Sequence, residues 1–243
     1  MEFLSTNILL SSSFIDWVVN INPSLFSMGE SLKAIITRFP TFWKAGLITL
    51  QLTSAGILFG LLIGLLFGLM RVSEIKFMRY PAKAYIFLIR GTPLLLQLFI
   101  IYYGITSIIT IRSFPSAVIA LGIHNGAYIA EIFRGAIQSI DKGQMEAARS
   151  LGMSKTKAME RIIMPQAFKR AIPSLGNQFI IALKDSSLAS TITISELLLR
   201  ARQIGNTHFI LMEMLIVVAI WYLILTSLFT YLIHRLEVHF KTS

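Results

Sequence analysis

The sequence predicts an all-α integral membrane protein with five transmembrane helices. Hydrophobic residues make up 55% of its 243 residues, whereas charged residues make up only 14%. A soluble domain carries roughly a quarter charged residues, so this deficit favours a chain embedded in a bilayer. Long apolar runs separated by short basic segments then indicate how many spans there are.

The first apolar run covers 45–70. As a helix it is about 39 Å long, which exceeds a hydrocarbon core of ~30 Å and predicts a tilted span. Glycines recur along one face at every fourth position, a spacing that lets another helix pack backbone to backbone. They are Gly56, Gly60, Gly64 and Gly68. The polar residues of the outer half are Thr49, Gln51 and Thr53.

Residues 1–43 are expected to form an N-terminal outer or interfacial segment, and 44–243 a five-helix transmembrane domain. Turn formers stand at Asn20, Asn22 and Pro23. From Ser31 onward, apolar residues recur at helical spacing opposite basic ones, which predicts an amphipathic helix along the membrane face. Phe39, Phe42 and Trp43 then read as an interfacial aromatic belt. A poorly ordered extension is an equal alternative for 1–25, and no cleaved signal peptide is expected.

The second span, 84–108, is interrupted by Arg90, Gly91, Thr92 and Pro93. Proline disfavours helix at the preceding residue and removes one backbone donor. Inside a bilayer such a break survives only where protein or water satisfies the freed groups. The remaining spans are expected at 114–137, 175–194 and 208–233, with 195–207 as an outer loop.

Residues 141–173 are predicted to form two short helices joined at a rigid elbow. Asp141 can cap the first helix, with Gln144 reaching back as in a capping box, and Gly152 can end it in a left-handed turn. Ser154 can cap the second helix, which Pro165 is expected to weaken or stop. Ala147 and Ala148 would leave one face bare, so that a partner can approach the backbone.

The distribution of basic residues predicts the orientation. With this elbow in the cytoplasm, thirteen Lys and Arg lie inside and six outside. Basic loops stay preferentially on the inner side, so the N-terminus is expected outside and the C-terminus inside. The net charge of +10 is therefore read as a topology signal and not as a nucleic-acid surface.

Nothing in the sequence indicates catalysis. The motifs of metalloproteases, phosphate loops, dinucleotide sites and serine hydrolases are absent, and there are no cysteines. The four histidines are scattered, so we expect no metal site and no enzyme. Polar groups inside the spans are costly in lipid and suggest a midplane site for a small zwitterion. The candidates are Gln51, Gln97, Asn125, Tyr128, Glu131, Lys184, Asp185 and Ser186. Glu131 and Arg134 can pair on one helix face, as a structural or a functional pair.

Four stretches of the chain resemble a known family. Glu146-Ala147-Ala148, Gly152 and the Ile162 to Pro165 stretch resemble the "EAA" loop of ATP-binding-cassette importer permeases, with Met164 where that family has leucine. The stretches 90–99, 127–135 and 184–188 look like the polar amino acid branch, which comprises the histidine, glutamine, glutamate and arginine permeases. The similarity runs from about Lys44 to the C-terminus.

This resemblance implies a permease subunit in the bacterial inner membrane, whose partners are a second permease, identical or a sister, two cytoplasmic ATPase subunits and an extracytoplasmic amino-acid-binding protein. The elbow would be the coupling loop, with Glu146, Ala147, Ala148, Gly152 and Pro165 meeting the ATPase. No cofactor is expected in this chain, because ATP and Mg²⁺ would sit on the ATPase. One alternative is an ion-gradient-driven carrier, which does not require such a loop. The other is a non-transporting scaffold whose loop recruits a cytoplasmic partner, but a scaffold has no use for the charges inside the spans.

Overall fold

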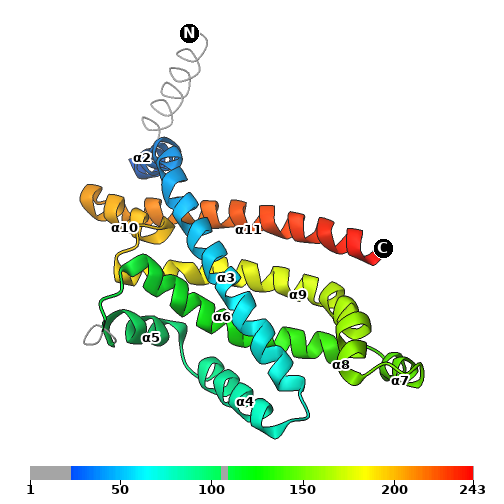
Figure 1. The fold of residues 1–243 in the computed structure, drawn as a ribbon. Helices are drawn as coiled ribbons and strands as arrows, with labels where there is room; N and C mark the ends of the chain where they lie inside the picture. Colours follow the sequence, from blue (N-terminus) through cyan, green and yellow to red (C-terminus); the bar gives the residue numbers. More distant parts are fainter. Residues whose placement is uncertain (1–22, 105–108, 243) are drawn as a thin grey trace.

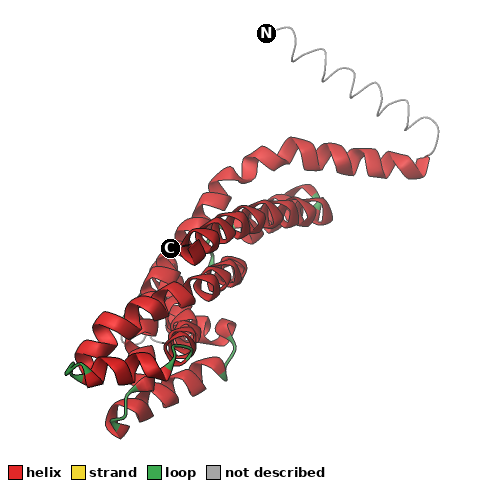
Figure 2. Ribbon diagram, turned by 90° about the vertical axis from the view of Figure 1, so that its right-hand side faces the viewer, coloured by secondary structure: helices red, strands yellow, loops and turns green. Residues whose placement is uncertain are grey.

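The computed structural model describes residues 23–104 and 109–242, and every regular element in them is helical (Figure 2). The predictions for Asn20, Asn22 and the end of the second span near Ile108 lie outside these residues. The α-helices, in chain order, are α2 Pro23–Arg38, α3 Trp43–Val72, α4 Lys76–Arg90, α5 Leu94–Phe99, α6 Ser113–Gln138, α7 Lys142–Ser150, α8 Lys155–Ala158, α9 Met164–Asp185, α10 Leu197–His208 and α11 Leu211–Thr242. Short 3-10 segments at Phe39–Phe42 and Ser186–Ile192 and π-helical turns at Ile100–Gly104 and Met159–Ile163 connect some of them.

The bundle is organised around the crossing of α3 over α6 (Figure 1). All four predicted glycines of α3 are buried against α6. A Cβ at Gly60 would lie 3.2 Å from the backbone oxygen of Gly122, and one at Gly68 would lie 3.1 Å from that of Ala130. The spacing in the sequence therefore predicted the close helix pair correctly, because only hydrogen fits between the two backbones.

Three helical stretches are long and apolar enough to cross a membrane: Gly29–Val72, Ser113–Gln138 and Leu211–Val238. Helices α4 and α5, which are bent by 102° at their break, make a fourth span if the bent pair is counted as one. The break predicted at Pro93 is confirmed, since α4 ends at Arg90 and α5 begins at Leu94. The count of five spans stays a prediction.

Three boundaries differ from those expected. Pro165 does not stop a helix: it stands in the first turn of α9, directly after the π-helical turn Met159–Ile163. The expected fourth span is not continuous, because α9 ends at Asp185 and a 3-10 segment follows. Residues 197–208 are helix α10 rather than a loop, because Glu196 caps them by accepting from the amides of Leu198 and Leu199.

The prediction of an interfacial aromatic belt is also corrected by the structure. Phe42 is fully buried in the core formed with α10 and α11, and Phe39 stacks on Trp221 with 5.0 Å between ring centroids. Of the three aromatics only Trp43 is exposed, at 60%. Pro23, read as a turn former, instead begins α2, a position that its fixed φ favours.

Candidate functional site

The elbow, here called the bracket and defined as α7, α8 and the turn between them, lies at the end of the bundle opposite α10 (Figure 1). Asp141 caps α7 by accepting the amide of Gly143 at 2.7 Å. No side-chain bond from Gln144 to the cap occurs among the described residues, so the reciprocal half of the capping box is not formed. Ser154 caps α8 through the amide of Lys157 at 3.3 Å. Both predicted caps are therefore confirmed.

Gly152 is the pivot of the bracket. It has φ +82°, a conformation that side chains rarely adopt. The Met153 amide donates to the Ala148 carbonyl at 3.1 Å, and the Gly152 amide to that of Arg149 at 3.0 Å. This pair of bonds is a Schellman motif, which ends α7 in a defined direction. The predicted glycine elbow is confirmed.

The two alanines of α7 face opposite ways. Ala147 is exposed beside the exposed Glu146, whereas Ala148 is only 1% exposed and packs inward. The bare face expected from both alanines is therefore offered by Ala147 alone, because adjacent helical residues diverge by about 100°. Leu151, which we had not singled out, is 84% exposed at the tip. Its place just before the left-handed glycine was the signal that could have pointed to it.

An ion pair and the chain itself join the bracket to the bundle, and a further hydrogen bond joins the helices on either side of the bracket. Lys155 of α8 forms an ion pair with Glu74 in the segment between α3 and α4. Arg170 of α9 donates to the backbone oxygen of Ser139, just after α6. The π-helical turn at Met159–Ile163 joins α8 directly to α9.

The side-chain amide of Gln97 bridges the break between α4 and α5, and the Thr92 hydroxyl donates to the Leu88 carbonyl at 2.9 Å. The Gln97 Nε2 donates to the carbonyls of Ile89 at 2.8 Å and Thr92 at 3.1 Å, and to the Thr92 hydroxyl at 2.8 Å. Its Oε1 lies 3.1 Å from the Nδ1 of His124 on α6. Gln97 therefore satisfies carbonyls that the break leaves free, as a protein interior in a bilayer requires.

A cavity of about 590 Å³ opens beside this break, between α3, α4 and α6. Its charged and aromatic lining consists of Arg71, Lys83, Phe87, Arg90, Tyr128 and Glu131. The Arg90 guanidinium lies 5.0 Å from the Tyr128 ring centroid, and that ring lies 5.2 Å from the His124 ring. A chain of contacts therefore runs from the cavity through α6 to the break.

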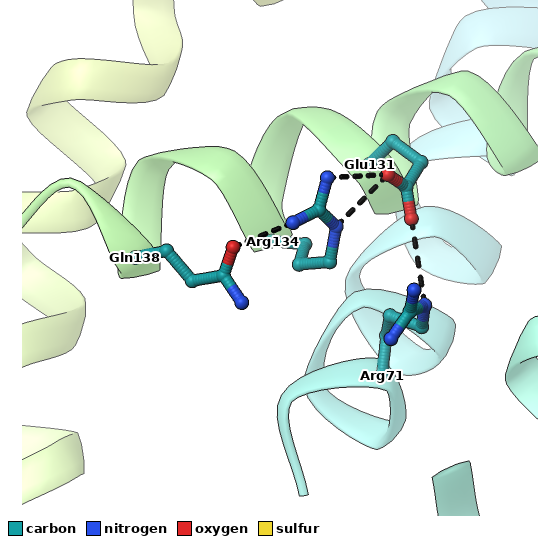
Figure 3. Close-up of polar contacts among 4 residues, drawn as sticks. All are labelled: Arg71, Glu131, Arg134 and Gln138. Atoms are coloured by element: carbon teal, nitrogen blue, oxygen red, sulfur yellow. Dashed lines mark hydrogen bonds and ion pairs between the residues drawn. The ribbon is translucent and has the colours of Figure 1, made fainter.

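Glu131 is the acidic residue in the lining of this cavity. Figure 3 shows its carboxylate between Arg134, one turn later on α6, and Arg71 at the end of α3. The distances are 2.7 Å to Arg134 and 3.6 Å to Arg71. The predicted Glu131–Arg134 pair is confirmed, and the second arginine leaves the cavity with excess positive charge.

The other predicted pathway residues are dispersed. Asn125 is fully buried and accepts from Gln178 of α9 at 2.8 Å, so it cross-links two helices. At the end of α9, Lys184 is exposed, Asp185 half-buried and Ser186 buried with its hydroxyl donating to the Leu183 carbonyl. Gln51 is exposed on α3. The structure brings Gln97, Tyr128 and Glu131 to the neighbourhood of one cavity but does not line that cavity with the others.

The architecture is that of a helical membrane permease, with a broken span, a polar cavity and a protruding two-helix bracket. Residues 56–240 match the model of the family described as the inner membrane component of binding-protein-dependent transport systems. The chain belongs to this family, and it is a multi-pass protein of the bacterial inner membrane.

Individual proteins are similar over most of their length. The chain is 39% identical over 202 residues to the probable amino-acid permease protein YxeN of Bacillus subtilis (strain 168), covering 82% of this chain and 90% of that protein. It is 37% identical over 211 residues to the glutamine transport system permease protein GlnP of Escherichia coli (strain K12), covering 86% and 96%. A crystal structure of an amino acid ABC transporter with histidines matches with a TM-score of 0.80 and 40% identity over 85% of this chain and 97% of that chain.

Proposed function

We propose that this chain is the permease subunit of an ATP-driven importer of polar amino acids. The observation that carries this proposal is the bracket, which is capped at both helices, turned at a left-handed glycine and exposed at the end of the bundle. A stiff, protruding element of this kind is suited to receive mechanical work from a second protein. Family membership and the similarity to amino-acid permeases support the same proposal.

Polar amino acids are the substrate class favoured by the cavity. It presents both charges, through Arg90 and Glu131, and an aromatic ring, through Tyr128. Groups of both signs suit the carboxylate and ammonium of a zwitterion. Among the relatives are permeases for glutamine, arginine and L-cystine. We favour a substrate of the histidine, glutamine or arginine type. Asp185→Asn is expected to impair uptake without impairing assembly.

The proposed assembly contains two permease subunits, identical or sisters, two cytoplasmic ATPase subunits and an extracytoplasmic amino-acid-binding protein. ATP and Mg²⁺ bind the ATPase subunits. Glu146 and Ala147 offer a charge and a close approach to the ATPase, while Ala148 and Gly152 fix their direction. Closure of the ATPase pair moves the bracket, and its connections to α6 and α9 carry that movement to the cavity.

Coupling is tested with bracket variants in proteoliposomes that hold the whole transporter. Glu146→Arg reverses the exposed charge, and Gly152→Pro removes the left-handed turn, because proline cannot adopt a positive φ. Both variants should reach the membrane and assemble, and both should hydrolyse ATP without the matching uptake. Glu30→Arg, the same charge change on α2, is the control. Normal uptake per ATP in both bracket variants would remove the bracket from the mechanism.

The proposed orientation has its own test, because the chain contains no cysteine. Ala147→Cys provides one exposed thiol on the bracket, and Asn206→Cys one on α10. A membrane-impermeant maleimide should label Ala147→Cys only in inside-out vesicles and Asn206→Cys only in right-side-out vesicles. The reverse pattern would place the bracket outside and contradict an ATPase contact.

A further inference from the structure

A second polar cavity lies far from the bracket, between the end of α2 and α10. It measures about 250 Å³. Its polar lining, here called the α2–α10 cleft, consists of Arg38, Thr41, Arg200, Gln203, Thr207 and His208. Two guanidinium groups, two hydroxyls and an amide thus surround one small space, and the set contains no carboxylate.

The positive charge of this cleft is not neutralised within the described residues. The ion pairs among the described residues use only the carboxylates of Glu74 and Glu131, which are both remote from the cleft. Glu196, one turn before Arg200, is fully buried and binds the amides of Leu198 and Leu199 and the Tyr222 hydroxyl. Glu213 accepts from Ser31 at 2.7 Å. Among the described residues, none of these carboxylates is paired with a cation of the cleft.

The cleft stands where two apolar helices begin. Arg38 ends α2 shortly before α3 starts at Trp43, and His208 ends α10 shortly before α11 starts at Leu211. Both α3 and α11 belong to stretches that can cross a membrane. Arg38 lies within the first of these stretches, Gly29–Val72, and shortly before the apolar run 45–70. The start of such an apolar run is the level of the lipid headgroups.

Large apolar side chains are exposed beside the cationic lining. Phe209, next to His208, is 96% exposed, and Met212 is 69% exposed. Phe209 also has φ +57°, an uncommon conformation for a bulky residue, which is closed by the bond from the Ile210 amide to the Gly205 carbonyl at 2.9 Å. The backbone thus holds an aromatic ring outward in a place where glycine or asparagine is usual.

We propose that the α2–α10 cleft binds the phosphate of an anionic phospholipid, whose acyl chains run past Phe209. Arginine pairs with phosphate oxygens through two parallel hydrogen bonds, and the side-chain amide of Gln203 is a further donor in the cleft. The Thr41 and Thr207 hydroxyls already donate to the carbonyls of Arg38 and Gln203. The carboxylates of an acidic protein would use the cations but leave the neighbouring apolar side chains without a partner. An amphiphile satisfies both parts of the surface.

Native mass spectrometry of the transporter, purified as its complex in a mild detergent and titrated with phosphatidylglycerol or phosphatidylcholine, tests this site. We expect one phosphatidylglycerol per chain to bind in preference to phosphatidylcholine. Arg38→Gln combined with Arg200→Gln should weaken that binding about tenfold or more, because each basic group near the surface contributes to anionic-lipid affinity. Arg202→Gln is the matched control, since it removes the same charge from an exposed position of α10 outside the cleft.

Thr207→Glu is a second test at an exposed position, and it should weaken phosphatidylglycerol binding by adding an anion to the cleft. If the double arginine variant does not accumulate, Thr207→Glu alone tests whether the cleft binds phosphatidylglycerol. Equal phosphatidylglycerol binding by the wild type, the cleft variants and Arg202→Gln would overturn the proposal. Unchanged lipid binding with lost uptake, in vesicles of either lipid, would also overturn it and would assign the cleft to a protein partner.

Discussion

The contact between α3 and α6 and the break between α4 and α5 solve opposite problems. In the first, hereafter the seam, side chains are removed so that two backbones can meet, and four buried glycines of α3 accomplish this. In the second, a side chain is added, because Gln97 donates to the carbonyls at the break. The seam stays closed through close packing, whereas the break depends on a few hydrogen bonds that can exchange partners.

This difference indicates where the permease can bend. A glycine-lined helix pair has no alternative packing at the same distance, so α3 and α6 should move as one body. The α4 and α5 pair can change its angle of 102° if Gln97 releases its acceptors. Because Gln97 also touches His124, one turn from Tyr128 in the cavity, bending and cavity occupancy are expected to be linked.

The largest effect is expected at the seam. A methyl group at Gly64 would meet the Gly126 oxygen at 3.0 Å and the Ile129 side chain still more closely. Gly64→Ala should therefore destabilise the fold by about 1–3 kcal/mol through overpacking. Gly135→Ala on α6 is the control, since no atom lies within 4 Å of its added Cβ, and alanine there should stabilise the helix by about 0.5–1 kcal/mol. Thermal unfolding in detergent measures the stability of both variants. Equal unfolding midpoints would contradict the close packing of the seam.

An effect no larger than that at the seam is expected at the break. Gln97→Leu keeps most of the volume but leaves the Ile89 and Thr92 carbonyls without their donor, which should cost about 1–3 kcal/mol. Gln51→Leu, an exposed glutamine of α3 with no such bonds, should leave the unfolding midpoint unchanged. If both leucine variants unfold alike, Gln97 does not hold the break.

The smallest effect concerns the exposed link between the bracket and the bundle. The hydrogen bond and charge of Lys155 lower the pKa of Glu74 from its ordinary value of 4.5. A lowered pKa means that the link is complete above pH 4.5 and is lost as the pH falls through the folded-state value. Added salt screens the link at neutral pH. Hydrogen exchange of α8 should rise with salt in the wild type and not in Glu74→Gln, and an equal salt response would exclude the link.

Local chemistry made several of these features readable in the sequence. The four-residue spacing of Gly56 to Gly68 predicted the seam, and Pro93 predicted the break. The cap at Asp141 and the left-handed turn at Gly152 followed from the preferences of single residues. Each of these depends on the backbone of a few neighbouring positions, so no long-range information was needed.

Features set by tertiary contacts were predicted less well. Ala148 turned inward because α7 packs on the bundle, and Phe42 was buried by α10 and α11. The helix α10 was missed because its cap, Glu196, is held by Tyr222 from another helix. The cavity beside the break joins residues of α3, α4 and α6, and its second arginine, Arg71, was counted only as a loop charge. Hydropathy alone does not place such contacts.

The source of energy for transport is the most direct test of the account. Proteoliposomes containing this permease are loaded with ATP and Mg²⁺, with and without the ATPase subunits, and amino-acid uptake is followed with and without an ion gradient. We predict uptake that requires the ATPase and ATP and that is indifferent to the gradient. Uptake that follows the gradient in the absence of the ATPase would contradict the account and would make the chain a self-sufficient carrier.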